Sequence, residues 1–227
     1  MTEPTLGRSA QKRRAILSTA QSLFLTNGYQ GTSVDQIAAG AAVSKQTVYK
    51  HFGDKHELLV AIVNETLGDT MAPILDRIAA LADTTDIDTD LTNLARDYIS
   101  AVLQDPVVQL RRLVIGEANR VPELAQVYYE QAQGRSLNAF TQAFARLQDR
   151  GLLTIDEPAL AAEHFAFLVI GRCVDQALFL GAGSVRADAD VDELAEHGLR
   201  VFLAAYRPRG ELAATSVPTR AAGRSES

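Results

Sequence analysis

The sequence lacks several features that would place it in a membrane or in an oxidising compartment. It contains one cysteine, Cys173, and no tryptophan, so an intramolecular disulfide and a cysteine-based metal cluster are excluded. Its longest apolar run, residues 165–170, is far shorter than the roughly 20 residues that a membrane-spanning helix needs. The basic cluster Lys12–Arg14 runs into a segment of helical periodicity rather than into the apolar stretch of a signal peptide. We therefore expect a soluble, cytoplasmic protein without membrane contacts.

Acidic residues outnumber basic ones over the whole chain, but not near its N-terminus. The chain carries 22 Lys and Arg against 28 Asp and Glu, a formal net charge of −6. Residues 1–53 hold six of the basic and two of the acidic residues, a balance of +4, whereas the remainder has a balance of −10. A basic segment joined to an acidic one suits a protein whose two parts face different partners, although a short window can also be basic by chance.

Apolar residues recur with the period of an α-helix almost throughout, and no window alternates as an exposed strand would. We predict an all-α fold of about nine helices, with Pro73 kinking or interrupting the fourth. The expected parts are a helix-turn-helix unit at 10–55, a helical domain at 56–207 and a disordered tail at 208–227. Helices are expected at about 11–26, from Ser33, from Ser44, and at 55–81, 89–104, 106–119, 122–150, 157–180 and 191–207.

Three helix starts lie close together in the N-terminal segment. Ser33 and Gln36 form a capping box, Ser44 is a second N-cap, and Asp54 with Glu57 forms another box. Starts as close as these leave room for two helices of only a few turns each, packed across a tight turn. The capping chemistry alone therefore predicts a helix-turn-helix.

The second of these short helices, residues 44–51, has an outer face without acidic side chains. Each side chain on that face can bond a base edge or a phosphate, as a helix inserted in the major groove of DNA requires. The alternative is a solvated helix of a bundle, which would normally mix Glu and Asp among its lysines. The face comprises Lys45, Gln46, Thr47, Tyr49, Lys50 and His51.

Many positions within residues 10–70 match a known family pattern, namely Ile16, Ala20 and Phe24, Gly28, Thr32-Ser33, Ile37-Ala38, Val43-Ser44, Thr47 to Phe52, Lys55 and Leu58-Leu59. On these residues the segment closely resembles the N-terminal domain of the TetR family of transcriptional repressors. It implies that the protein binds a double-stranded DNA operator. The chain departs from the family at Ala42, where a glycine is usual; if this turn needs a positive φ, alanine costs about 1 kcal/mol.

The resemblance also assigns roles to the residues that match the family motif. Phosphate contacts are implied for Thr32, Ser33, Tyr49, His51 and Lys55. Base-edge contacts, or contacts beside the bases, are implied for Lys45, Gln46, Thr47 and Lys50, with Ser44 in the same surface as the helix N-cap.

Residues 107–181 are similar to the C-terminal domain of the AefR-like subgroup, on the residues Arg112-Leu113-Val114, Glu117-Ala118, Pro122-Glu123-Leu124 and Tyr128. This similarity implies a homodimer through the last two helices, about 157–181 and 191–206. The sequence itself supports such a contact, because the apolar positions from Phe165 to Leu180 spread around more than one face of their helix. The alternative is a central helix buried within one subunit.

The same similarity makes residues 56–207 an effector-binding and dimerisation domain. It implies a pocket for an unknown small apolar or amphipathic ligand whose binding releases DNA. Which residues line the pocket cannot be read from the sequence, and weak candidates are Arg111, Asn119, Tyr128, Arg172 and Asp175.

Three functions remain open at this point. The first is a ligand-released repressor, and the second is a DNA-binding protein without an effector. The third is an enzyme with a vestigial DNA-binding unit. It would use Glu163-His164, but no nucleophile motif accompanies this pair.

We expect no catalytic site, no cofactor and no metal. The calcium-like run Asp86-x-Asp88-x-Asp90 has Leu91 where the sharp turn of such a loop needs glycine.

Overall fold

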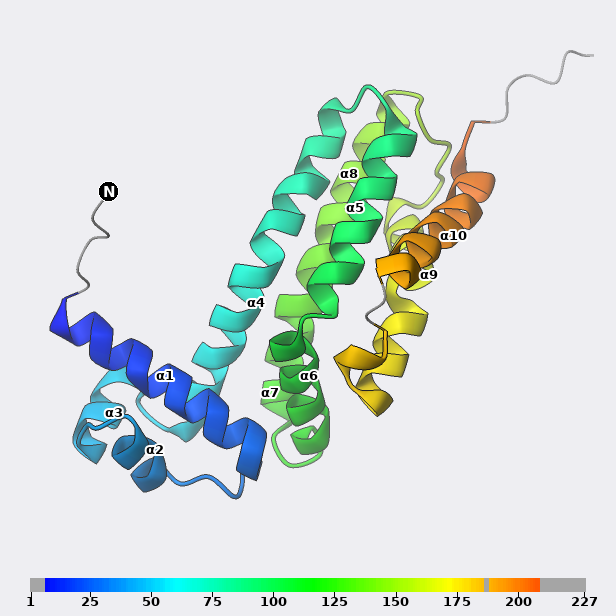
Figure 1. The fold of residues 1–227 in the computed structure, drawn as a ribbon. Helices are drawn as coiled ribbons and strands as arrows, with labels where there is room; N and C mark the ends of the chain where they lie inside the picture. The colour runs from blue at the N-terminus through cyan, green and yellow to red at the C-terminus, as the bar shows by residue number, and fades with distance from the viewer. Residues whose placement is uncertain (1–6, 186–187, 209–227) are drawn as a thin grey trace, which may run out of the picture.

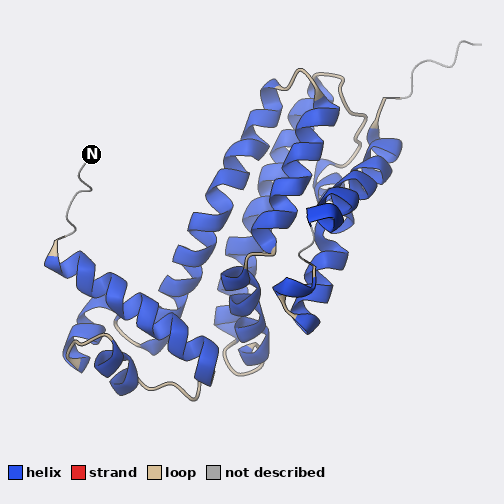
Figure 2. Ribbon diagram, viewed as in Figure 1, coloured by secondary structure: helices blue, strands red, loops and turns tan. Residues whose placement is uncertain are grey.

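The computed structural model describes residues 7–185 and 188–208, and all regular structure in these ranges is helical (Figures 1 and 2). The predicted tail lies outside the described residues, apart from Pro208. The helices are α1 (Arg8–Asn27), α2 (Val34–Gly40), α3 (Lys45–Phe52), α4 (Lys55–Ala80), α5 (Ile87–Val102), α6 (Asp105–Glu117), α7 (Pro122–Tyr129), α8 (Arg135–Asp149), α9 (Pro158–Leu180) and α10 (Asp188–Tyr206). Short turns of other helix types follow α4 at Leu81–Asp83 and α9 at Ala182–Ser184.

The all-α prediction is confirmed, although several element boundaries differ from those predicted. The fifth helix begins at Ile87, inside a segment expected to be a loop, because the Asp86 carboxylate accepts the Thr89 N–H at 3.1 Å and caps it. Helix α4 runs without interruption through Pro73. Met71 and Ile74 on either side of the proline are buried, so core packing holds both turns in place despite the lost backbone hydrogen bond.

Two apolar cores organise these helices, and α4 contributes to both. The first core joins α1, α2, α3 and the first half of α4, up to Leu67, to one face of α6 and α7. The second joins the rest of α4, from Met71, to α5, α8, α9 and α10. Residues 7–53, here called the head, therefore share their core with helices far along the sequence. Figure 1 shows the head at one end of the molecule, with α10 remote from it.

The second core is centred on aromatic rings. Phe140 and Phe144 of α8 meet Phe165 of α9 and Phe202 of α10, and all four side chains are fully buried. Ring centroids lie 4.9 Å apart for Phe140 and Phe165 and 5.1 Å apart for Phe144 and Phe202. These separations suit tilted aromatic packing, which fixes α8, α9 and α10 against one another.

The predicted helix at 122–150 is one helical run divided by a π-helical turn, Glu130–Gly134, into α7 and α8. Before the turn, Leu124 and Tyr128 pack into the first core. After it, Phe140 and Phe144 pack into the second core. The π-helical turn thus lies where the run passes from one core to the other.

Among the described residues, one helical stretch, Lys55–Asp83, is long and apolar enough to cross a membrane. Its apolar side chains are instead shared between the two cores, from Leu58 and Leu59 at one end to Ile78 and Leu81 at the other. This is the arrangement of a core helix.

Candidate DNA-binding site

Two short helices of the head form the helix-turn-helix that the sequence predicts. Helix α2 buries Ile37 and Ala38, and α3 buries Val48 and Phe52, all in the first core. They pack with α1, which contributes the fully buried Phe24 among others. Because Val48 and Phe52 point into this core, the opposite face of α3 is left to solvent.

Side-chain caps fix where both helices begin. Ser33 Oγ accepts the Gln36 N–H at 3.2 Å, and Gln36 Oε1 accepts the Ser33 N–H at 2.7 Å, which completes the predicted capping box. Ser44 Oγ accepts the Thr47 N–H at 3.1 Å and lies 2.8 Å from the Thr47 hydroxyl. These caps show that the side chains of Ser33, Ser44 and Thr47 stabilise the starts of α2 and α3. Ser33 and Ser44 are nevertheless exposed.

The turn between the two helices contains a residue in the left-handed region, Ala42, with φ of 54°. The Ala42 N–H donates to Ala39 O at 3.2 Å, and the Val43 N–H donates to Ala38 O at 3.0 Å. This is the Schellman ending of a helix, whose left-handed position glycine fills most easily. The positive φ considered from the sequence is therefore present.

The outer face of α3 carries the predicted base-contacting side chains. Lys45, Gln46 and Lys50 are exposed, Tyr49 is 43% exposed, and Thr47 and His51 are half-buried. The exposed side chains share one side of α3, as insertion into a groove requires. The Lys45 ammonium lies 3.0 and 3.1 Å from the two carboxylate oxygens of Asp35 on α2, a partner that the sequence reasoning missed.

The structure corrects the role implied for Thr32. Its side chain is 1% exposed, and its hydroxyl donates to the carbonyl oxygens of Gly28 at 2.9 Å and Leu23 at 3.1 Å. These hydrogen bonds hold the end of α1 against the loop before α2. The Thr32 hydroxyl is therefore buried and not accessible to a phosphate.

Lys55 also forms hydrogen bonds within the fold. Its ammonium donates to the carbonyl oxygens of Tyr29 at 2.9 Å and Thr32 at 3.1 Å, and it lies 4.3 Å from the centre of the Tyr29 ring. Burial lowers the pKa of Lys55 below its ordinary value. Two of its three N–H groups thus tie α4 to the loop between α1 and α2.

The weak effector-site candidates lie in different places. Asn119 is exposed in the turn after α6. Tyr128 is buried, and the Arg111 guanidinium lies 5.8 Å from the centre of its ring. Arg111 and Asp175 line a mostly apolar hollow of about 300 Å³ with Ile115, Gln133, Phe167, Ile170, Gly171, Val174 and Leu178.

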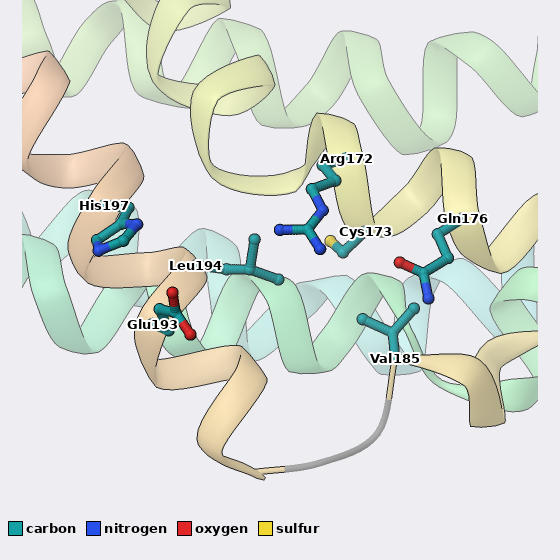
Figure 3. Close-up of a pocket in the computed structure, with 7 residues that line it drawn as sticks. All are labelled: Arg172, Cys173, Gln176, Val185, Glu193, Leu194 and His197. Atoms are coloured by element: carbon teal, nitrogen blue, oxygen red, sulfur yellow. The ribbon is translucent and has the colours of Figure 1, made fainter.

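Arg172 belongs to a separate pocket of about 210 Å³ between α9 and α10. Figure 3 shows its guanidinium reaching from α9 toward Leu194 on α10, with Glu193 and His197 on the same helix and the Cys173 sulfur close by. The structure therefore does not gather Asn119, Tyr128, Arg172 and Asp175 into one site.

Helices α9 and α10 carry large apolar side chains that are exposed. Phe179 and Leu180, at the end of α9, are 76% and 70% exposed, whereas Phe165 and Ile170 of the same helix are buried. Helix α9 is thus not a fully buried central helix. Exposed apolar side chains on neighbouring helices are typical of a contact with another protein chain. Those of α9 and α10 are Leu160, Phe167, Leu168, Phe179, Leu180 and Val201.

Two family models match this chain. The model for bacterial regulatory proteins of the tetR family matches residues 16–62, which include the helix-turn-helix. The model for the C-terminal domain of AefR-like transcriptional repressors matches residues 89–208, more than half of the chain.

Individual relatives agree with these matches. A putative TetR-family regulator from Mesorhizobium loti MAFF303099 is 34% identical, with a TM-score of 0.81 over 89% of this chain and 100% of that structure. SmeT, the repressor of the Stenotrophomonas maltophilia multidrug efflux pump SmeDEF, is 25% identical, with a TM-score of 0.60 over 91% of this chain and 95% of its own. An uncharacterised HTH-type transcriptional regulator of Bacillus subtilis, YezE, is 24% identical over 85% of this chain and 95% of its own.

These matches cover both the helix-turn-helix head, with its acid-free α3, and the helices that follow it. This chain belongs to the TetR family of bacterial transcriptional regulators, which are DNA-binding proteins and not enzymes, and it has an AefR-like C-terminal domain.

Proposed function

We propose that this regulator is a repressor that binds a near-palindromic operator as a homodimer and is released by a small apolar or amphipathic ligand. The observation that carries the DNA-binding part is the outer face of α3, exposed and without a carboxylate of its own. On this proposal Lys45, Gln46, Thr47 and Lys50 contact or flank base edges. Ser33, Ser44, Tyr49, His51 and the third N–H of Lys55 contact or border phosphates.

The homodimer is supported by the exposed apolar side chains of α9 and α10. One helix-turn-helix reads too few base pairs to be selective, and dimers of such units bind half-sites about one helical turn apart. Pairing α9 and α10 with the same helices of a second copy would cover Phe179 and Leu180 in a four-helix contact. We place the protein in the cytoplasm, where operator DNA is found.

The repressor role is supported by the likeness to SmeT, which is itself a repressor. The ligand class is supported by the hollow between α6 and α9, because its lining is mostly apolar while Arg111 and Asp175 supply polar groups. Helix α6 lines this hollow through Arg111 and Ile115 and also packs into the first core beside the head through Leu110 and Val114. A ligand that moved α6 would therefore act on the helices that carry the DNA-binding face.

Selection of duplexes from a randomised pool tests the DNA-binding part. The wild-type protein should enrich an inverted repeat, and its affinity should fall steeply with salt. We expect Gln46→Ala to broaden the selected sequence and Lys50→Ala to weaken binding roughly tenfold. Arg146→Ala, which removes an exposed cation from α8, is the matched control and should change neither. If Gln46→Ala and Lys50→Ala behave like Arg146→Ala, α3 is not the recognition helix.

A thermal-shift screen of lipophilic compounds tests the ligand part. A compound that binds the folded protein raises its melting temperature. We expect at least one such compound to displace the selected duplex as well, measured by the fluorescence anisotropy of labelled DNA. Compounds that raise the melting temperature but leave DNA bound would contradict release by a ligand.

A further inference from the structure

The ion pair between Asp35 and Lys45 joins the two helices of the helix-turn-helix on their exposed side. Asp35 is the second residue of α2 and Lys45 is the first residue of α3. The ammonium lies within 3.1 Å of both carboxylate oxygens, and the two side chains are 70% and 49% exposed. Asp35 is also the single acidic residue between Thr5 and Gly53, in a segment otherwise basic.

Folding stability gives this pair only a small role, although Asp35 lies in the first turn of α2, where a carboxylate is favourable. Ion pairs as exposed as this one contribute little to folding, because water and salt screen them. A lysine in the first turn of a helix is unfavourable, since the amide dipoles make that end positive, and Asp35 offsets this locally. The carboxylate itself stands on the side where we propose that DNA binds, so it would repel phosphates if Lys45 did not neutralise it.

We propose that Asp35 is a specificity-determining residue that acts through Lys45. By holding the ammonium between α2 and α3, Asp35 keeps Lys45 from neutralising a nearby phosphate of any duplex. The remaining N–H groups of Lys45 are then directed at the base edge that the N-terminus of α3 meets. This inference rests on the proposed function, because it assumes that α3 enters the groove.

Two measurable consequences follow for Asp35→Asn. The freed ammonium can pair with a phosphate, so the slope of log affinity against log salt steepens by about 0.9, the value for one added phosphate contact. Affinity for a scrambled duplex rises while base readout by Lys45 weakens, so the ratio of specific to non-specific affinity falls roughly tenfold, as for the loss of one good base contact. The capping box of Ser33 and Gln36 does not involve the Asp35 carboxylate, so α2 keeps its start.

The experiment compares the wild-type protein and four variants on two duplexes, the one that the wild-type protein selects and a scrambled duplex of the same composition. The variants are Asp35→Asn, Lys45→Ala, the double variant, and Asp69→Asn, which makes the same change of charge at an exposed position of α4. Affinities are measured from low to moderate salt, and duplex selection is repeated with Asp35→Asn. Circular dichroism checks that each variant is folded.

Asp35→Asn should steepen the salt slope and relax the base preference, and Asp69→Asn should do neither. With Lys45 already removed, Asp35→Asn should no longer steepen the slope, because no cation is freed. An unchanged slope and preference in Asp35→Asn, or an equal steepening with and without Lys45, would overturn the inference. A wild-type protein that selects no duplex would instead refute the proposed function.

Discussion

At the scale of single residues, Ala42 has a backbone conformation that residues with a Cβ rarely adopt. Its φ of 54° lies in the left-handed region, which costs a residue with a Cβ about 1–2 kcal/mol. The turn nevertheless forms, because it is closed by the backbone hydrogen bonds from Ala42 and Val43 and by the packing of α2 and α3.

Replacing Ala42 by glycine should therefore stabilise the protein. We expect Ala42→Gly to raise the free energy of unfolding by about 0.5–1 kcal/mol, because relief of the left-handed strain exceeds the entropy that glycine adds to the unfolded chain. The matched control is Ala39→Gly in α2, which should lower it by about the same amount. Urea denaturation measures both, and a loss of stability in Ala42→Gly would contradict the strain.

Cys173 should be unreactive in the folded protein. Burial raises the pKa of its thiol to about 11, and its S–H donates to Ile170 O. Little thiolate therefore exists at neutral pH, and a disulfide reagent at pH 8 should label the unfolded protein but not the native one. Rapid native labelling would show that α9 and α10 open.

The same thiol has an effect on stability at high pH. In the unfolded chain it loses its proton near its ordinary value of 9, whereas the folded protein retains the proton up to about 11. Ionisation therefore favours the unfolded state, and the contribution of Cys173 to stability should be lost as the pH rises through this window. Cys173→Ala should remove this part of the pH dependence in urea titrations.

Some residue roles could be predicted from the sequence and others could not, for a physical reason. The caps Ser33, Ser44 and Asp54 act within three residues, so their local patterns were sufficient. The buried hydroxyl of Thr32 and the Asp35–Lys45 pair depend on how separate elements pack, which local patterns do not contain. The individual DNA contacts remain predictions.

At the scale of elements, α9 and α10 cross closely at Gly198. A Cβ built there would lie 2.8 Å from Leu168 O and 3.2 Å from Val169 Cα. Both are backbone atoms, which cannot move aside as a flexible side chain can. The closeness of the two helices thus depends on the missing side chain at this position.

We expect Gly198→Ala to lower the free energy of unfolding by about 1–3 kcal/mol, since the two helices must separate to admit the methyl group. Gly68→Ala is the control, because it lies within α4 and a Cβ there meets no atom within 4 Å. This control should raise stability by up to about 1 kcal/mol. Urea denaturation of both variants measures the contrast, and equal effects would mean that the crossing has room for a side chain.

Element types were predicted better than element boundaries. Periodicity and capping residues are local, so they predicted the helices in the right order. They did not predict two features. Pro73 does not end α4, because burial on both sides of it outweighs one lost hydrogen bond. The π-helical turn at Glu130–Gly134 was not foreseen, since its residues carry no Pro and only one Gly.

At the scale of the whole molecule, the exposed end of α9 should decide the oligomeric state. We expect Phe179→Asp to convert a dimer to monomers in sedimentation velocity and to weaken operator binding strongly, because a charge replaces an apolar side chain that is 76% exposed in one subunit. Tyr129→Asp is the control, since Tyr129 is 56% exposed but belongs to α7 and not to α9 or α10. A dimer that survives Phe179→Asp would place the contact elsewhere.

The π-helical turn at Glu130–Gly134 bears on how such a chain tolerates changes of length. Each added or deleted residue in an α-helix rotates everything beyond it by about 100°. A π-helical turn, with its i→i+5 hydrogen bonds, holds one residue more than an α turn. Deleting Gln133 would therefore close it to an α turn and leave Leu124 and Phe140 in their own cores. Deleting Asn138, inside the regular helix α8, would instead turn Phe140 and Phe144 away from Phe165.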